Sequence, residues 1–205
     1  MPLVLPPLYA ILDPEQTKGR APEWVLRQLL VGGAKTLQLR AKAMAPRDFW
    51  TLAVEVRAQT RAAGCPMIVN DRIDIALACD ADGVHLGQDD VPLGAGKKLM
   101  GRKIVGISTH DVDQAREAEN NGADYIGFGP MFGTATKATG YGARGVEMLK
   151  QIRAAVTIPI VAIGGITEQN VQQVWQAGAD SAAIISDILG AQDIADKVAR
   201  ISRTH

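Results

Sequence analysis

The chain has 205 residues, of which 47% are hydrophobic and 21% charged, so it can bury one full core and is not a disordered or fibrous protein. Its 22 basic residues balance 22 acidic ones, and no global field exists that would recruit nucleic acid or an anionic membrane. The apolar opening, MPLVLPPLYAIL, contains prolines and no basic lead, so we expect neither a signal peptide nor a membrane span. Cys65 and Cys79 lack metal-type spacing and are interpreted as buried structural thiols of a cytoplasmic protein.

Short apolar runs alternate with longer amphipathic stretches along the chain. Helical spacing of apolar residues predicts helices over 22–30, 47–62, 112–121, 146–155 and 170–177. The runs predicted as strands are 8–12, 36–39, 67–69, 83–86, 103–108, 125–129, 158–163 and 181–186. Strands that are apolar throughout indicate a parallel sheet covered by helices on both faces. We therefore predict an α/β protein, a single (β/α)8 TIM barrel over residues 1–205; the alternative is a doubly wound open sheet, which eight unbroken units disfavour.

A loose internal repeat supports the barrel. The segments GGAKTLQL, DADGVHL, NGADYIGF and AGADSAAI each lead from a helix end into every second predicted strand. Gly33, Gly122 and Gly178 are predicted to end helices in the left-handed conformation. Short connections favour Gly-Ala-Asp in any case, so the repeat is supporting evidence only.

Acidic residues follow the third and fourth apolar runs, at the end of a barrel where catalytic groups lie. Asn70 and Asp71 follow one run, and Asp89 and Asp90 follow the next. Paired carboxylates suit Mg²⁺, which takes few protein ligands and completes its shell with water and phosphate oxygens. One acid of the second pair is expected only to cap the helix that begins near Val91. Asn70 has two open readings, a bond to loop backbone or to a substrate amine.

Basic residues follow the second run, in the segment QLRAK. Gln38, Arg40 and Lys42 are expected on the same side of an extended segment, where two cations could bind a phosphate or diphosphate. A solvated basic turn is the alternative, and it is more frequent for an isolated pair of this kind. Other anion ligands nearby favour the binding site.

The loops after the fifth and sixth runs contain further polar groups. Ser108 or Thr109 could bind an anion or, more commonly, cap the helix that starts near Asp111. The sixth run leads into a long loop rich in glycine and threonine, and loops of this length in compact barrels are usually functional. Its polar groups include Thr134, Thr136 and Lys137.

Glycine-rich and small-residue turns follow the seventh and eighth runs, where barrels often bind phosphate. Gly164 and Gly165 would let backbone amides approach an anion, and Ile185 with Ser186 could add further amides near a helix start. A tight turn without a ligand is the alternative reading. His85, within the fourth run, is expected to be a hydrogen-bonded core histidine rather than a metal ligand.

The combination indicates a cation site, a diphosphate clamp and a separate phosphate site, with no evident nucleophile. Chemistry would then depend on a substrate that carries its own leaving group. At this point the segments QLRAK, NDRIDIALACDADGVHLGQDD, GISTH, GADYIGFGPMFGTATK, AIGGI and IIS, in this order, closely resemble the thiamine-phosphate synthase family. The resemblance implies transfer of a hydroxymethylpyrimidine group from its diphosphate to the nitrogen of hydroxyethylthiazole phosphate, by a dissociative mechanism.

The resemblance also implies roles for individual residues. Asp71 and Asp90 would hold Mg²⁺, and Thr134 with Thr136 would contact the thiazole. The thiazole phosphate would lie against Gly165, Ile185 and Ser186. The pyrimidine diphosphate would lie against Gln38, Arg40, Lys42, Asn70, Ser108 and Lys137, of which Arg40, Lys42, Ser108 and Lys137 would be catalytic.

Two departures and two alternatives accompany this resemblance. The family commonly has proline where this chain has Gly133, and the segment ATGYGARG is unusually rich in glycine. Related thiazole tautomerases lose the metal acids and carry a histidine where this chain has Pro130, so the two aspartates favour the synthase. A non-catalytic protein that binds thiamine phosphate is the other alternative. The oligomeric state is left open, with a homo-oligomer as one possibility.

Overall fold

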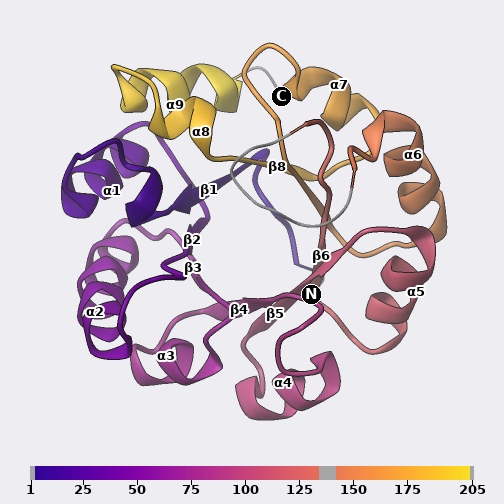
Figure 1. Ribbon diagram of the computed structural model, residues 1–205, viewed down its shortest axis with the longest axis horizontal. Helices are drawn as coiled ribbons and strands as arrows, with labels where there is room; N and C mark the ends of the chain where they lie inside the picture. Colours follow the sequence, from indigo (N-terminus) through magenta and orange to yellow (C-terminus); the bar gives the residue numbers. More distant parts are fainter. Residues whose placement is uncertain (1–2, 134–141, 204–205) are drawn as a thin grey trace.

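The structure, a computed structural model, describes residues 3–133 and 142–203. Eight parallel strands pair in chain order and close into a barrel, and the helices lie around its outside (Figure 1). The strands are β1 (Leu8–Leu12), β2 (Leu37–Leu39), β3 (Met67–Asn70), β4 (Gly83–Leu86), β5 (Ile104–Thr109), β6 (Tyr125–Phe128), β7 (Ile160–Ile163) and β8 (Ser181–Ile184). The predicted barrel is therefore confirmed.

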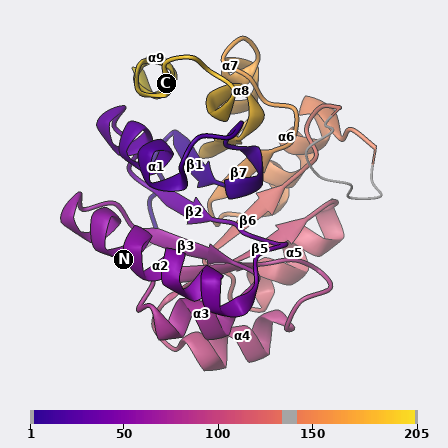
Figure 2. The same ribbon diagram turned by 60° about the vertical axis from the view of Figure 1, so that its left-hand side comes forward.

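The helices follow the strands in alternation. They are η1 (Pro14–Gln16), α1 (Pro22–Val31), α2 (Pro46–Ala62), α3 (Ile73–Ala78), α4 (Leu93–Met100), α5 (Val112–Asn120), α6 (Gly145–Ala155), α7 (Val171–Gln176), α8 (Ser186–Leu189) and α9 (Ile194–Arg203). In Figure 2 the side that carries α1, α2 and α3 comes forward, and these helices cover the neighbouring strands. None of the helices in the described ranges has the length and apolar character needed to cross a membrane.

Burial explains why the strands could be predicted. Nearly every strand residue is buried, because one face packs inside the barrel and the other packs under a helix. The inner cluster consists of Tyr9, Ile11, Ile68, Tyr125, Val161 and Ala183, and the larger outer cluster lies between barrel and helices. Leu3 and Leu5, in the segment before β1, pack against the inner cluster.

The internal repeat has a structural cause. Just before three alternate strands, an aspartate accepts a hydrogen bond from a backbone N–H at the start of the preceding strand. The same aspartate pairs with a cation on the helix that leads into that preceding strand. The aspartates and their backbone donors are Asp82 with Met67, Asp124 with Val105 and Asp180 with Ile160, at 2.7, 2.7 and 2.8 Å. The cations are Arg57, Lys97 and Arg153. Each aspartate thus ties together two strands and one helix.

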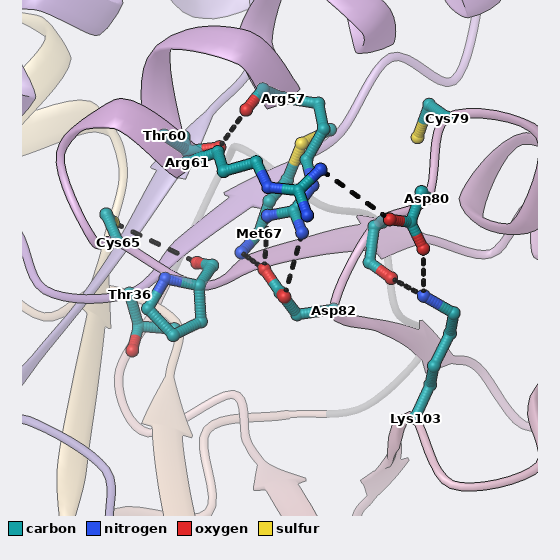
Figure 3. A network of polar contacts seen from close by, with 12 residues as sticks. Thr36, Arg57, Thr60, Arg61, Cys65, Met67, Cys79, Asp80, Asp82 and Lys103 are labelled. Atoms are coloured by element: carbon teal, nitrogen blue, oxygen red, sulfur yellow. Dashed lines mark hydrogen bonds and ion pairs between the residues drawn. The ribbon is translucent and has the colours of Figure 1, made fainter.

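Figure 3 shows the first of these junctions. Two nitrogens of Arg57 donate to the two carboxylate oxygens of Asp82, at 2.7 and 3.1 Å, while Met67 donates its N–H to one of them. Beside this junction, Lys103 donates a hydrogen bond to Asp80 at 2.7 Å.

The predicted left-handed helix ends are confirmed, since Gly33, Gly122 and Gly178 have φ values of +95°, +82° and +104°.

Candidate active site

A pocket opens at the carboxyl ends of the strands, the end where barrels carry their active sites. It has about 950 Å³ of empty volume, including the part open to solvent. Seven of the residues predicted from the sequence line it: Gln38, Arg40, Asn70, Ser108, Gly165, Ile185 and Ser186. Residues from strands all around the barrel therefore meet in one cavity. The predicted residues Thr134, Thr136 and Lys137 lie outside the described part of the chain.

The two predicted metal ligands lie close together on the rim. Burial raises the pKa of the Asp90 carboxyl, and the negative charge of Asp71 raises it further. Asp71 forms an ion pair with Lys42, with Nζ 3.0 Å from Oδ2. Asp71 also has a φ of +62°, a strained conformation for a residue with a side chain, and its N–H donates to the His85 carbonyl at 2.8 Å.

This donor set fits magnesium. Asp71 and Asp90 would be the two protein ligands of such an ion, since no group of three or more His, Cys, Asp or Glu within the described residues could hold a metal. Mg²⁺ is commonly bound in this way, with water and substrate phosphate oxygens as the remaining ligands. A cation between Asp71 and Asp90 would also offset both causes that raise the pKa of Asp90, its burial and the negative charge of Asp71.

The expectation that Asp89 or Asp90 caps the next helix is wrong. The residue at the N-cap of α4 is Pro92, and no side chain makes a capping bond there. Asp90 instead accepts a hydrogen bond from the Gly87 N–H at 2.6 Å, across its own loop. Asp89 is exposed. Asp90 is therefore held in place by the loop it belongs to, beside Asp71.

The basic segment after β2 is held by acids that the sequence analysis did not identify. Lys42 lies in a turn, not on the extended segment that was expected. Arg40 donates from Nη1 to the fully buried carboxylate of Asp13, which directly follows β1. Glu15 accepts from the backbone N–H of Ala43 at 3.0 Å. The turn after the first strand thus fixes both the side chain of Arg40 and the backbone beside Lys42.

Asp13 could have been identified from the sequence. It is an acid directly after an apolar run, the same pattern that identified Asp71. Its partner Arg40 belongs to the next loop, and adjacent strands of a parallel barrel bring such residues together.

A chain of hydrogen-bonded polar side chains crosses the barrel interior at the bottom of the pocket, and all five of its members line the pocket. It runs from Gln38 through Tyr9, Tyr125 and His85 to Ser108, with distances of 3.2, 2.7, 3.0 and 2.9 Å between successive polar atoms. The prediction that His85 is a hydrogen-bonded core histidine is confirmed.

The alternative that Ser108 or Thr109 caps α5 is wrong, because Asp111 occupies the N-cap and accepts from the Gln114 N–H.

The loops after β7 and β8 form one wall of the pocket. Gly164 and Gly165 have φ values of +100° and +68°, and a Cβ on Gly165 would lie 2.6 Å from the Gly133 carbonyl oxygen. Glycine is therefore required here by the loop after β6, a cause that the sequence analysis did not consider. Asn170 donates from Nδ2 to the Gly165 carbonyl at 3.1 Å and fixes the turn.

An ion cluster behind this wall joins the two loops. Asp187, which follows Ser186, accepts from the Glu168 N–H at 2.8 Å. Lys197 from α9 lies 3.0 Å from carboxylate oxygens of both Asp187 and Glu168. Arg200 and Lys197 hold the pKa of Glu168 down to about 2. The last helix of the barrel thus fixes the loops that carry the predicted phosphate-binding residues.

Comparisons with known proteins agree with this geometry. The family model described as thiamine monophosphate synthase matches residues 8–188. A thiamine-phosphate synthase of Chloroflexus aurantiacus is 46% identical over 91% of this chain and 87% of its own length. One from Syntrophomonas wolfei is 45% identical over 91% and 90%. The solved structure of a thiamine phosphate pyrophosphorylase from Pyrococcus furiosus has a TM-score of 0.87 and 34% identity over 96% of this chain and 94% of its own. The chain belongs to the thiamine monophosphate synthase family.

Proposed function

We propose that the chain is a magnesium-dependent thiamine-phosphate synthase. It would transfer the hydroxymethylpyrimidine group from its diphosphate to the nitrogen of hydroxyethylthiazole phosphate, giving thiamine phosphate and diphosphate. Membership of the family and the printed names of the relatives support the reaction. The buried free thiols Cys65 and Cys79 support a reducing compartment such as the cytoplasm.

The observation that carries the proposal is the pair of interacting carboxylates beside two cations. Asp71 and Asp90 repel one another, and Lys42 with Arg40 lies on the adjacent loop. Such a rim suits a diphosphate bridged to a divalent cation, because carboxylates bind the metal and basic side chains bind the phosphate oxygens. A site for a neutral substrate would need neither set.

The roles of the remaining residues follow from this arrangement. Asp71 and Asp90 would hold Mg²⁺, which would neutralise charge on the departing diphosphate oxygens. Arg40 and Lys42 bind the same diphosphate and stabilise the charge that develops as the bond breaks. Lys137 shares this role in the proposal.

The protein needs no nucleophile, because the electron-rich aminopyrimidine stabilises the cation formed when diphosphate leaves. Gln38, Asn70 and Ser108 line the pocket and would orient this ring. Thr134 and Thr136 would contact the thiazole. Its phosphate would lie against Gly165, Ile185 and Ser186.

The proposal is tested by incubating the purified protein with both substrates and magnesium. Thiamine phosphate and diphosphate are expected in equal amounts, and removal of magnesium with a chelator should abolish both. Absence of product at saturating substrate would overturn the proposal. Conversion of the thiazole phosphate alone, without metal, would indicate an isomerase, and ligand binding without turnover would indicate a binding protein.

A matched pair of variants tests the metal site. Asp90→Asn should lower turnover about a hundredfold or more, the scale of losing one preorganised charge contact at a reacting group. Asp89→Asn removes the same charge from the neighbouring, exposed position and should leave turnover unchanged. Equal effects of the two variants would place the metal elsewhere.

A further inference from the structure

The buried chain that links Gln38 to Ser108 contains three side chains that the proposed reaction does not use. Tyr9 and Tyr125 are 1% exposed, and their hydroxyl oxygens lie 2.7 Å apart inside the barrel. Burial raises the pKa of both phenols well above the ordinary value, so each keeps its proton. His85 connects them to Ser108, which lines the pocket.

The strands leave room for this chain at two glycines. A Cβ on Gly106 of β5 would lie 2.1 Å from Cζ of Tyr125, and a Cβ on Gly127 of β6 would lie 2.9 Å from Cε1 of His85. Both rings therefore occupy space that any other residue at these positions would fill. The chain is a built feature of the barrel, with its rings fixed by packing.

The direction of the hydrogen bonds follows from the Gln38 end. Gln38 Nε2 can only donate, and it faces the Tyr9 hydroxyl at 3.2 Å. Tyr9 therefore accepts there and donates its own proton to Tyr125, the neighbouring oxygen. If Tyr9 accepted from Tyr125 as well, its proton would have no acceptor among the described residues in a fully buried place, which is costly.

The same order continues through the histidine. Tyr125 accepts from Tyr9, so it donates to His85 Nδ1 at 3.0 Å. Nδ1 is then unprotonated, and the imidazole proton is on Nε2, which donates to Ser108 Oγ at 2.9 Å. Because Ser108 already accepts this bond, its own hydroxyl proton is free to point into the pocket.

We propose that Tyr125 and His85 are positioning residues that fix Ser108 as a hydrogen-bond donor to the bound pyrimidine diphosphate. The part that concerns substrate rests on the proposed function. Without this chain, the Ser108 hydroxyl could donate to the imidazole and would then present only lone pairs to the substrate. A fixed donor removes the cost of reorienting the hydroxyl when substrate binds.

The tautomer of His85 tests the proposal without any turnover. The protein has three histidines, so their side-chain nitrogens can be resolved by ¹⁵N NMR and assigned with a His85→Gln variant. Near neutral pH, His85 should carry its proton on Nε2 alone. Tyr125→Phe removes the group bonded to Nδ1 and should change this signal. Tyr9→Phe should shift part of the signal toward a proton on Nδ1, because Tyr125 no longer accepts from Tyr9 and can then accept from the imidazole. A proton on Nδ1 in the wild type would overturn the proposal.

Kinetics test the link to Ser108. Tyr125→Phe and Ser108→Ala should each lower kcat with the pyrimidine diphosphate about five- to tenfold, the size of one hydrogen bond, and leave the KM for the thiazole phosphate unchanged. The double variant should be no slower than either single one, since both remove the same donor. Additive losses would overturn the role of Tyr125. Failure of the wild type to turn over would refute the proposed function and leave the NMR result interpretable.

Discussion

Asp13 forms an ion pair with Arg40, which lines the pocket, and the carboxylate of Asp13 is completely buried. A buried carboxylate is tolerated when its oxygens are bonded, and here the second oxygen accepts from the Glu15 N–H at 3.0 Å. Among the described residues the charge of Asp13 has one partner side chain, Arg40, which belongs to the proposed diphosphate site. Its role is to hold the guanidinium of Arg40 in one orientation.

Asp13→Asn should weaken binding of the pyrimidine diphosphate. The amide keeps the size of the side chain and an oxygen for the Glu15 N–H, but it loses the charge that orients Arg40. We expect KM for the pyrimidine diphosphate to rise about tenfold, equivalent to about 1.4 kcal/mol. The KM for the thiazole phosphate should not change. Steady-state kinetics with each substrate varied in turn measure both.

Glu55→Gln, on the exposed face of α2, is the control for charge alone and should leave both constants as in the wild type. If Asp13→Asn raises the two KM values together, or only lowers the unfolding free energy, the pair stabilises the fold and does not position Arg40.

The fold was predictable because burial on both faces makes each barrel strand a continuous apolar run. All eight predicted runs overlap a strand, and the five predicted helices are present within two residues of their expected bounds. The prediction omitted α9, although Ile194, Val198 and Ile201 are buried at helical spacing. That helix packs on α1, where the last strand of the barrel meets the first, and the local sequence pattern does not predict this contact.

The site was predictable only in part, for a physical reason. Residues at the carboxyl ends of strands, such as Asn70 and Ser108, line the pocket because the fold places every strand end at one rim. Which residues contact one another across the barrel depends on strand register. The bonds of Tyr9 to Tyr125 and of Arg40 to Asp13 join positions 116 and 27 residues apart, and neither follows from spacing.

The three repeat aspartates predict a stability effect without an activity effect. Asp124→Ala would leave the Val105 N–H without its acceptor and Lys97 without its ion-pair partner. We expect the free energy of unfolding to fall by about 1–3 kcal/mol, the cost of one unsatisfied buried donor. Urea denaturation should show a lower midpoint with an unchanged m-value. Turnover should stay normal, because these residues lie at the strand starts, away from the pocket.

Asp180→Ala makes the same test at the next equivalent position and should give a loss of similar size. Effects below about 0.5 kcal/mol at both positions, the range of ordinary surface substitutions, would show that the repeat reflects turn preference alone.

Two glycine substitutions should change stability in opposite directions. Gly106→Ala would put a methyl group 2.1 Å from the ring of Tyr125, which cannot move inside the barrel, so overpacking should cost about 1–3 kcal/mol or more. Gly94→Ala, in α4, meets nothing within 4 Å and should stabilise the protein by about 0.5–1 kcal/mol through helix propensity. Thermal or urea unfolding of the two variants measures both. A stable Gly106→Ala protein would mean that the Tyr125 ring is not held as described.

The ion cluster of Glu168, Lys197 and Asp187 predicts a loss of stability in acid. The pKa of Glu168 is about 2 in the folded chain, below its ordinary value of 4.5, so the unfolded chain binds more protons between these two values. The stabilisation is therefore complete above about pH 4.5 and is lost as the pH falls toward about 2. Glu168→Gln should lower stability at neutral pH and flatten the decline below pH 4.5 relative to the wild type. Urea unfolding at several pH values compares the two proteins; parallel curves for both would show that Glu168 is not linked to folding.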